Sequence, residues 1–185
     1  MVPLIVVAAF FAGSIPFGVL IAKRRGVNIR EQGSGNIGAT NVGRVLGIGP
    51  GLLVLGLDAL KGAAAAELAL VWCGMDRVVA VAGFAAVLGH CFSPFLGGKG
   101  GKGVATTLGV FAILSPALAI VGIAVFAVVA GRTRIAALGS LGGIVSATVY
   151  AFATGAPLSV ELSALGTTLL LIYTHRGNLA RLLTS

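Results

Sequence analysis

The stretch VATTLGVFAILSPALAIVGIAVFAVVA, from Val104 to Ala130, decides how many times this chain can cross a membrane. As one helix, its about 27 apolar residues would be roughly 40 Å long, whereas a bilayer has a hydrocarbon core of about 30 Å. Ser115 and Pro116 interrupt the stretch, and proline kinks or breaks a helix. Two readings therefore remain at this point: one overlong span, or two short spans at 104–114 and 116–130.

The composition of the whole chain indicates a membrane protein. Of its 185 residues, 57% are hydrophobic and only 10% are charged, whereas soluble domains are about 25% charged. The mean hydropathy is +1.06, and apolar runs of about 20 residues recur along the chain, as expected for helices that cross a bilayer. The net charge of +8 fits membrane topology better than nucleic-acid binding, because the charges are so few.

The other apolar runs complete the set of predicted spans. The first run contains Pro16 and lacks the basic start and small-residue cleavage site of a signal peptide, so we expect it to be retained as a span. All spans belong to one predicted transmembrane domain, 1–185. The predicted spans lie at about 2–22, 50–72, 77–92, 104–114, 116–130, 135–153 and 158–174.

The basic residues decide between one and two crossings of the 104–130 stretch. With two crossings, nearly all cations lie on one side of the membrane; only Arg77 lies opposite, and Lys61 lies inside a span. With one crossing, Arg132 and Arg134 move to the other side. The positive-inside rule favours two crossings. We therefore predict an all-α protein of seven transmembrane helices, with its N-terminus outside and its C-terminus in the cytoplasm.

A glycine-rich basic segment, GGKGGKGVATT, covers Gly97–Thr107. Glycine lets backbone N–H groups approach a bound atom closely, and N–H groups at a helix start beside a lysine form an anion site. The spacing is not that of a Walker A loop, because Gly103 follows Lys102 where Ser or Thr is needed. The segment is interpreted either as a phosphate-binding loop or as a flexible basic connection between two membrane helices.

The predicted topology brings three polar segments to one side of the membrane: Gly33–Arg44, Gly97–Thr107 and His175–Arg181. Short hydroxyl and amide groups, a guanidinium fork and an ammonium group are suited to phosphate and to sugar-like hydroxyls. The candidate groups are Ser34, Asn36, Thr40, Asn41, Arg44 and Lys102, together with His175 and Asn178, which share a face if the last helix continues.

Several of these residues also have a purely structural interpretation. Ser34, Asn36 and Thr40 are common turn and cap residues, and Arg44 could serve only to set topology. His90 borders an apolar run and is typical of a packing or interfacial histidine.

Two charges inside a predicted span need an explanation of their own. Asp58 and Lys61 lie three residues apart, and charge within a membrane is costly unless it is paired. We expect them to neutralise each other and to face the loops' side of the bundle. Cys73 and Cys91 end apolar runs and lack metal or disulfide spacing, so we expect buried small hydrophobes.

The sequence lacks several side-chain patterns that common types of catalysis require. The cytoplasmic loops contain one carboxylate, Glu31, so they offer no carboxylate pair for acid–base catalysis and no metal cluster, and a G-x-S-x-G nucleophile motif is absent. The acyltransferase pattern of histidine, four residues and aspartate fails as well, because Phe95 stands five residues after His90. An enzyme acting on a phosphorylated small molecule is favoured over an anion transporter, which would need charges near mid-membrane and an internal repeat.

Three long motifs resemble those of the bacterial acyl-phosphate glycerol-3-phosphate acyltransferases, the PlsY family. They are GSGNIGATNVGR at Gly33–Arg44, LGHCFSPFLGGKGGKGVATTLG at Leu88–Gly109 and IYTHRGNLARLL at Ile172–Leu183. The resemblance covers essentially the whole chain, including SIPFG at Ser14–Gly18 and LDALKG at Leu57–Gly62. It implies a multi-pass enzyme of the bacterial inner membrane that makes lysophosphatidic acid and phosphate from glycerol 3-phosphate and acyl phosphate.

The same resemblance implies which residues form the site, with the site facing the cytoplasm. The expected catalytic residues are Ser34, Arg44, Lys102, His175 and Asn178. The expected substrate- and phosphate-binding residues are Gly33, Gly35, Asn36, Gly38, Thr40, Asn41, Gly98, Lys99, Gly100, Gly101, Gly103 and Thr106. Family members often have glutamate where this chain has Gly177.

Both lines of reasoning lead to one mechanistic hypothesis. Arg44, Lys102, His175 and Asn178 hold glycerol 3-phosphate, and Ser34, Thr40 and the glycine-loop amides hold the acyl phosphate headgroup. The glycerol hydroxyl attacks the acyl carbonyl, and the leaving phosphate accepts the proton. General-base catalysis by His175 is the alternative. We expect no cofactor, no metal and no obligatory protein partner. The protein is expected to lie in a lipid bilayer.

Overall fold

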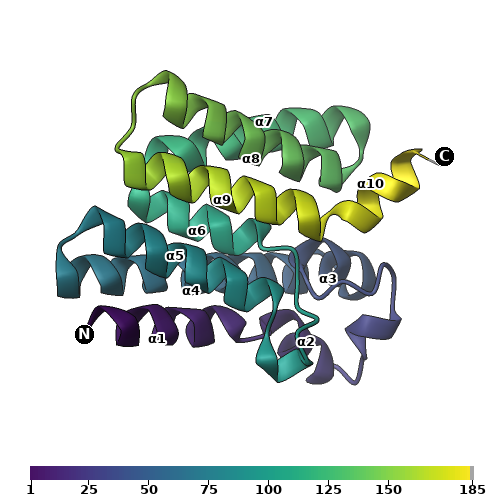
Figure 1. Ribbon diagram of the computed structural model, residues 1–185. Coiled ribbons are helices and arrows are strands. Elements are labelled where there is room, and N and C mark those ends of the chain that lie inside the picture. Colours follow the sequence, from purple (N-terminus) through teal and green to yellow (C-terminus); the bar gives the residue numbers. More distant parts are fainter. Residues whose placement is uncertain (184–185) are drawn as a thin grey trace.

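The computed structural model describes residues 1–183 and shows a bundle of helices (Figure 1). Strands are absent from this described part of the chain. The α-helices are α1 (Val2–Ser14), α2 (Phe17–Lys23), α3 (Ala39–Leu46), α4 (Ile48–Cys73), α5 (Asp76–Cys91), α6 (Val104–Leu114), α7 (Pro116–Thr133), α8 (Ala136–Ala153), α9 (Leu158–Thr174) and α10 (Arg176–Leu183). Two 3₁₀ turns cover Ile29–Glu31 and Pro94–Leu96.

Four of these segments are long and apolar enough to cross a membrane: Val2–Lys23, Asp76–Leu96, Pro116–Thr133 and Ala136–Ala153. Two shorter apolar helices, α6 and α9, accompany them. The all-helical membrane architecture is therefore confirmed. The count of seven spans and their orientation stay predictions.

Proline breaks two helical runs of the bundle. Ser115 has an extended backbone (φ −163°, ψ 99°) and separates α6 from α7, at the Ser115–Pro116 break considered in the sequence. The first apolar run is broken in the same way at Ile15 and Pro16, between α1 and α2. Because proline lacks a backbone N–H, it leaves carbonyl groups of the preceding turn without their helical partner. The break after α1 thus exposes a carbonyl that another helix can use.

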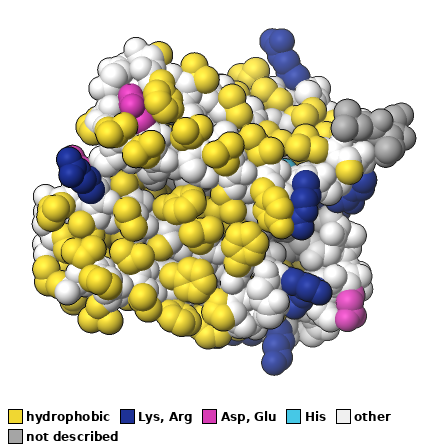
Figure 2. All heavy atoms as spheres, viewed as in Figure 1, with side chains coloured by type: hydrophobic (Ala, Val, Ile, Leu, Met, Phe, Trp, Pro, Cys, Tyr) yellow, Lys and Arg dark blue, Asp and Glu magenta, His cyan; other side chains and the backbone are white. Residues whose placement is uncertain are grey.

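Close packing inside the bundle depends on small residues. A Cβ at Gly109 of α6 would overlap the backbone of Ala59 in α4, and one at Gly13 of α1 would overlap the backbone of Ala86 in α5. Such contacts let helices approach closely where lipid supplies no hydrophobic driving force. Large apolar side chains cover the outer surface instead (Figure 2). Of the two cysteines, Cys91 is buried as expected, whereas Cys73 is half-exposed at the end of α4.

Polar segments gather at one end of the bundle. The 3₁₀ turn at Ile29–Glu31, α3, the glycine-rich loop and α10 lie together there, with basic side chains on the surface (Figures 1 and 2). The turns between α4 and α5 and between α8 and α9 lie at the opposite end, where Asp76, Arg77 and Leu158 line a common surface depression. The predicted gathering of the three polar segments is confirmed.

Candidate active site

The first polar segment is shaped by Asn41, a buried residue of α3 that is 2% exposed. Its Oδ1 accepts a hydrogen bond from the Ser34 N–H (2.8 Å), and its Nδ2 donates to the carbonyls of Gln32 (3.0 Å) and Asn36 (2.9 Å). The side chain of Asn36 in turn accepts from the Gly38 N–H (2.8 Å), one residue before α3. Asn41 therefore fixes the loop that presents Ser34 and Asn36.

Two glycines of this segment are required by backbone conformation. Gly33 and Gly35 have φ values of 60° and 71°, which side-chain-bearing residues rarely adopt. A Cβ at Gly33 would also overlap Asn41 Oδ1. Gly33 thus helps to close the turn beneath Ser34.

The glycine-rich loop folds back onto the end of α5. The N–H groups of Gly100 and Gly101 donate to the carbonyls of Cys91 and His90, each at 3.0 Å, and the Gly98 N–H donates to the Ser93 carbonyl at 2.9 Å. The N–H groups of Gly100 and Gly101 satisfy C-terminal carbonyls of α5, and that of Gly98 satisfies the carbonyl of Ser93 just beyond this helix. They are consequently occupied within the protein and are not directed at a phosphate.

Beyond this turn, the loop leads into the N-terminus of α6. Gly103 precedes α6 with φ 87°, and Gly103, Val104 and Ala105 line a cavity. The first N–H groups of a helix have no intrahelical acceptor and carry the positive end of the helix dipole. The start of α6 is therefore the part of the loop suited to binding an anion.

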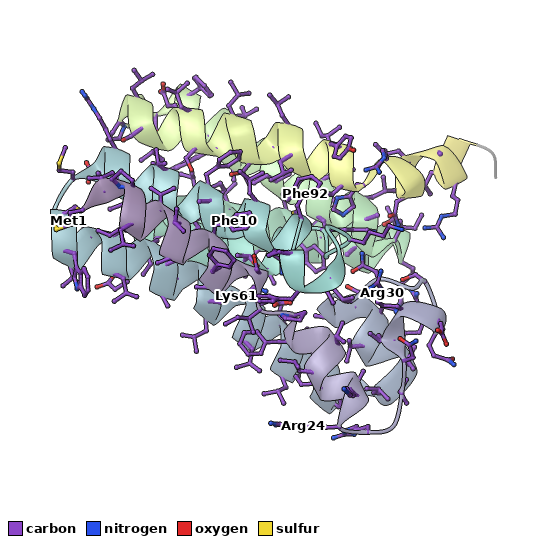
Figure 3. All side chains as sticks on the ribbon, turned by 60° about the horizontal axis from the view of Figure 1, so that its bottom comes forward. Met1, Phe10, Arg24, Arg30, Lys61 and Phe92 are labelled. Carbon is purple, nitrogen blue, oxygen red and sulfur yellow. The ribbon has the colours of Figure 1, made fainter. Side chains whose placement is uncertain are left out.

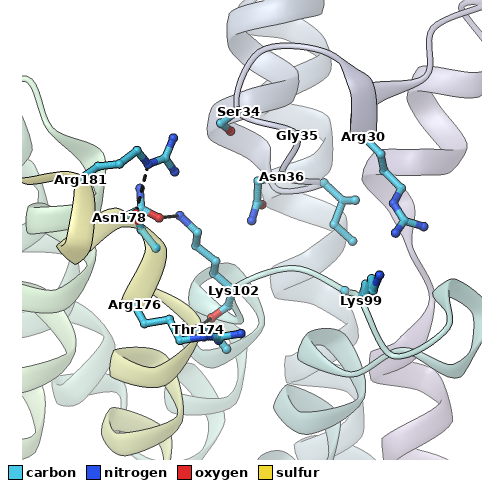
Figure 4. Close-up of a pocket in the computed structure, with 13 residues that line it drawn as sticks. Arg30, Ser34, Gly35, Asn36, Lys99, Lys102, Thr174, Arg176, Asn178 and Arg181 are labelled. Atoms are coloured by element: carbon cyan, nitrogen blue, oxygen red, sulfur yellow. Dashed lines mark hydrogen bonds between the residues drawn. The ribbon is translucent and has the colours of Figure 1, made fainter.

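Lys102 connects this loop to the third polar segment. Its Nζ donates a hydrogen bond to Asn178 Oδ1 (Figure 4), and its carbonyl accepts one from Thr174 Oγ1 at 3.1 Å. Burial lowers the pKa of Lys102 below the usual 10.5, and the positive charge of Arg181 lowers it further. Asn178 thus holds the ammonium group of Lys102, and Thr174 holds its backbone carbonyl.

His175 lies at the junction of α9 and α10 and is 2% exposed. Its Nδ1 is 2.8 Å from the Leu171 carbonyl, and because a carbonyl only accepts, we assign the proton to Nδ1. Burial lowers the pKa of His175; the bond to Leu171 raises it, and the charge of Lys102 lowers it. The ring is thus neutral near pH 7, and its Nε2 is a hydrogen-bond acceptor.

Two adjoining cavities lie at the polar end. The first, called here the cationic cavity, has a volume of about 460 Å³, and its lining includes the basic residues Arg30, Lys99, Lys102, Arg176 and Arg181. The second, called the mixed cavity, has about 360 Å³ and combines polar groups with apolar residues of α4, α7 and α8, namely Leu55, Phe126, Ala136 and Ala137. Both sizes suit small ligands. The residues common to both linings are Ser34, Asn36, Lys102 and Asn178.

Most of the residues expected from the sequence line these cavities, and the five expected catalytic residues all do. Those lining only the mixed cavity are Gly38, Thr40, Asn41, Arg44, Gly103 and His175. Those lining only the cationic cavity are Gly35, Lys99 and Gly100. Outside both linings are Gly33, Gly98, Gly101 and Thr106. Thr106 is fully buried and packs against Gly62 of α4, so its hydroxyl does not face either cavity.

Sequence reasoning misses several cations of the site. Arg30, Arg176 and Arg181 line the cationic cavity, and Arg134 lines the mixed cavity. In the sequence, the positive-inside rule alone accounts for them. Arg134 also has a left-handed backbone with φ 61°, which is uncommon for a residue other than glycine. No sequence signal separates such a residue from an ordinary topogenic charge.

The intramembrane pair predicted from spacing is confirmed. Lys61 Nζ lies 2.7 Å from Asp58 Oδ1, both on α4 and both buried, and Asp58 faces the loops' side because it lines the mixed cavity. The interpretation of His90 as a packing residue is incomplete. His90 is 5% exposed, lines the same cavity and places Nδ1 3.6 Å from Asp58 Oδ1.

Gly177, where family members often have glutamate, lines the cationic cavity on α10. A Cβ at this position would meet nothing within 4 Å. A glutamate side chain would therefore fit at position 177. With glycine there, this position contributes no carboxylate to the cationic cavity.

Comparison with known proteins identifies the family of this chain. The sequence profile of the family described as "Glycerol-3-phosphate acyltransferase" matches residues 3–185. A glycerol-3-phosphate acyltransferase of Aquifex aeolicus is 45% identical over 181 residues, covering 97% of this chain and 94% of the relative. One of Thermus thermophilus is 45% identical over 174 residues, covering 94% of this chain and 87% of the relative.

Two solved structures are similar over 99% of this chain and 92% of their own. Both are crystal structures of PlsY (YgiH), an integral membrane glycerol 3-phosphate acyltransferase. The glycerol 3-phosphate form has a TM-score of 0.95 at 44% identity, and the lysophosphatidic acid form has 0.93 at 43%. The match in sequence and in fold over nearly the full length shows that this chain belongs to the glycerol-3-phosphate acyltransferase family.

Proposed function

We propose that the chain transfers a fatty acyl group from acyl phosphate to the 1-hydroxyl of glycerol 3-phosphate. The products are lysophosphatidic acid and inorganic phosphate, and the reaction belongs to phospholipid biosynthesis. The observation that carries the proposal is the junction of two cavities at Ser34, Lys102 and Asn178. One cavity is strongly cationic and the other has an apolar wall, which suits one small phosphorylated substrate and one with a hydrocarbon tail.

Glycerol 3-phosphate enters through the cationic cavity, whose basic residues attract its phosphate. It is held by Arg44, Lys102, His175 and Asn178, four residues that line one continuous space. A guanidinium group binds two phosphate oxygens at once, and the Lys102 ammonium adds a point charge. These four groups reach the substrate from α3, the glycine-rich loop and the α9–α10 junction.

The acyl phosphate headgroup lies against Ser34, Thr40 and the N-terminus of α6. The amides at the start of α6 replace those of Gly98, Gly100 and Gly101 in this role, because the latter already donate to the carbonyls of Ser93, Cys91 and His90. The tail follows the apolar wall of the mixed cavity toward the bilayer. This placement brings the acyl carbonyl to the junction of the two cavities.

The chemistry then needs little from the protein beyond orientation. The glycerol oxygen attacks the acyl carbonyl, the carbonyl–phosphate bond breaks, and the leaving phosphate takes the hydroxyl proton. Fixed donors beside the carbonyl stabilise the developing oxyanion. Neutral His175 can accept a hydrogen bond from the attacking hydroxyl through Nε2, which orients that hydroxyl.

The membrane arrangement is part of the same proposal. The chain forms one domain of seven transmembrane helices in the bacterial inner membrane, with the N-terminus outside and both the C-terminus and the site facing the cytoplasm. Support comes from the distribution of basic residues and from the helix break at Ser115. Neither a cofactor nor a protein partner is needed for the proposed reaction.

The proposal is tested by finding out which acyl donor the protein uses. Purified protein in lipid is given glycerol 3-phosphate with palmitoyl phosphate, palmitoyl-CoA or palmitoyl-acyl carrier protein in turn, and lysophosphatidic acid and phosphate are measured together. Lys102→Ala tests the site, and Lys23→Ala, at an exposed lysine at the end of α2, is the matched control.

We expect turnover with palmitoyl phosphate alone, lost in Lys102→Ala and kept in Lys23→Ala. Turnover with either of the other donors would contradict the proposed donor. If no donor is used, the reaction as proposed is wrong, and anion flux into liposomes becomes the next measurement.

A further inference from the structure

A buried charge cluster joins three helices beneath the mixed cavity. Besides its 2.7 Å contact with Asp58, Lys61 Nζ donates to the Ile15 carbonyl at 2.8 Å. That carbonyl belongs to the break between α1 and α2, beside which Lys61 lies (Figure 3). Asp58 and Lys61 are 2% and 6% exposed. The cluster thus fixes α4 against the end of α1 and leaves the Asp58 carboxylate facing α5.

His90 extends this cluster from α5 to the glycine-rich loop. Its Nδ1 lies 3.6 Å from Asp58 Oδ1, which is beyond hydrogen-bonding distance. Its carbonyl accepts a hydrogen bond from the Gly101 N–H at 3.0 Å. A Cβ at Gly101 would overlap His90 Nε2, so the far edge of the ring lies directly against this glycine. Gly101 is not one of the residues with positive φ. The ring, rather than the backbone conformation, is what requires glycine there.

Lys102 is the next residue, and it is restrained on its other side as well. Thr174 Oγ1 donates to its carbonyl and Asn178 Oδ1 accepts from its Nζ. The backbone at Gly101 and Lys102 is therefore bounded by the His90 ring at Gly101 and by the hydrogen bond from Thr174 at the Lys102 carbonyl. Removing or displacing the His90 ring would therefore shift the backbone at Gly101 and, with it, the position of the Lys102 ammonium group.

We propose that His90 is a positioning residue of this enzyme: its ring, which lies between Asp58 and Gly101, supports Gly101 and thereby sets the position of Lys102 toward phosphate. The inference rests on the proposed function, in which Lys102 binds phosphate. His90 acts through the loop and not on the reacting atoms. Its loss changes phosphate affinity more than the chemical step.

Ring and glycine are complementary in size, and this gives a direct test. His90→Ala removes the support, and Gly101→Ala places a methyl group in the space that the ring occupies. Each single change should raise the KM for glycerol 3-phosphate and the inhibition constant of inorganic phosphate about tenfold or more, because small misplacements of a binding group are costly. In the double variant the methyl group enters the vacated space, so we expect part of the affinity to return.

Gly100→Ala is the matched control. A Cβ at Gly100 would meet the carbonyl oxygens of His90 and Cys91, which belong to the backbone. His90→Ala cannot relieve that contact. The defect of Gly100→Ala should therefore be unchanged or increased in the His90→Ala background, while that of Gly101→Ala shrinks at least about fivefold, within the usual range of coupling between contacting residues.

Two measurements keep the outcomes distinct. Binding of inorganic phosphate, measured by calorimetry, applies even to inactive variants, and thermal unfolding shows whether each variant is folded. Independent effects of His90→Ala and Gly101→Ala would overturn the inference. So would a fall in kcat with unchanged phosphate affinity, which would instead make His90 a participant in the chemistry. If the unchanged protein binds phosphate but shows no turnover, the proposed function fails while the calorimetric test of His90 still applies.

Discussion

The Lys102 ammonium group donates a hydrogen bond to the Asn178 side-chain oxygen across 76 positions of the chain. The two residues come from the glycine-rich loop and from α10, and both line both cavities. An ammonium group has three donors, so Lys102 can keep Asn178 and still bind phosphate oxygens. Asn178 therefore fixes the direction of the Lys102 side chain and leaves two of its three N–H donors for phosphate.

Replacing Asn178 by alanine should release the Lys102 side chain. We expect the KM for glycerol 3-phosphate to rise about tenfold, since aligned binding groups lose affinity when their orientation is no longer fixed. The kcat should fall less, because Lys102 keeps its charge. Steady-state kinetics in lipid measures both constants. Ser163→Ala, which removes a buried hydroxyl of α9 outside both cavities, is the control, and equal effects of the two variants would contradict the prediction.

Replacing His175 by glutamine separates binding from base catalysis. Glutamine keeps a polar group near the position of Nε2 but cannot take up a proton at neutral pH. We expect the KM for glycerol 3-phosphate to rise about tenfold with kcat within a factor of about three, as for a residue that contributes binding. A kcat lowered by about 10²–10⁴ with little change in KM would instead identify His175 as the general base.

The lowered pKa of His175 predicts how kcat/KM falls at acidic pH, on the acid limb of its pH profile. Its neutral form is the one that accepts a hydrogen bond from the substrate hydroxyl, and burial keeps that form populated below the usual pKa of 6.5. As the pH falls through the lowered pKa, the ring gains a proton and kcat/KM should decline. The midpoint of this decline should therefore lie below pH 6.5.

Phosphate groups also titrate with a pKa near 6, so the comparison with His175→Gln is essential. The part of the limb that belongs to His175 should disappear in this variant, leaving only the titration of the substrates. Superimposable pH profiles for the two proteins would show that His175 does not titrate in this range.

The sequence predicts the architecture well because its signals are local. Apolar runs of membrane length, the break at Pro116 and the placement of basic residues each follow from a few neighbouring residues. The spacing of Asp58 and Lys61 is local too, and their pairing is found at 2.7 Å. The carbonyl of Ile15 that Lys61 also binds could not be predicted, because it depends on how α1 and α4 pack.

The site was predictable only as far as its motifs extend. The residues with recognisable chemistry, such as Arg44 and Lys102, line the cavities. Glycine content alone does not tell which N–H groups are free, and those of Gly100 and Gly101 donate to the end of α5. His90 and Arg134 enter the site through tertiary folding. Neither residue lies in a spacing that distinguishes it from a packing histidine or a topogenic arginine.

The buried pair of Asp58 and Lys61 gives a prediction about stability. Asp58→Asn leaves a buried ammonium group without its carboxylate, which typically costs about 3–5 kcal/mol. Asp58→Asn combined with Lys61→Met removes both charges and should recover much of this loss, although the Ile15 carbonyl then loses its donor. Thermal unfolding in lipid, followed by circular dichroism, measures the difference.

Glu31→Gln is the control, because it removes one charge from an exposed position outside the predicted spans. It should change the unfolding temperature little, since charges exposed to water contribute little to stability. If Asp58→Asn proved as stable as Glu31→Gln, the pair would not hold the bundle together. If the double variant were less stable than Asp58→Asn alone, the bond from Lys61 to the Ile15 carbonyl would outweigh the ion pair, and the break between α1 and α2 would be the element that Lys61 mainly stabilises.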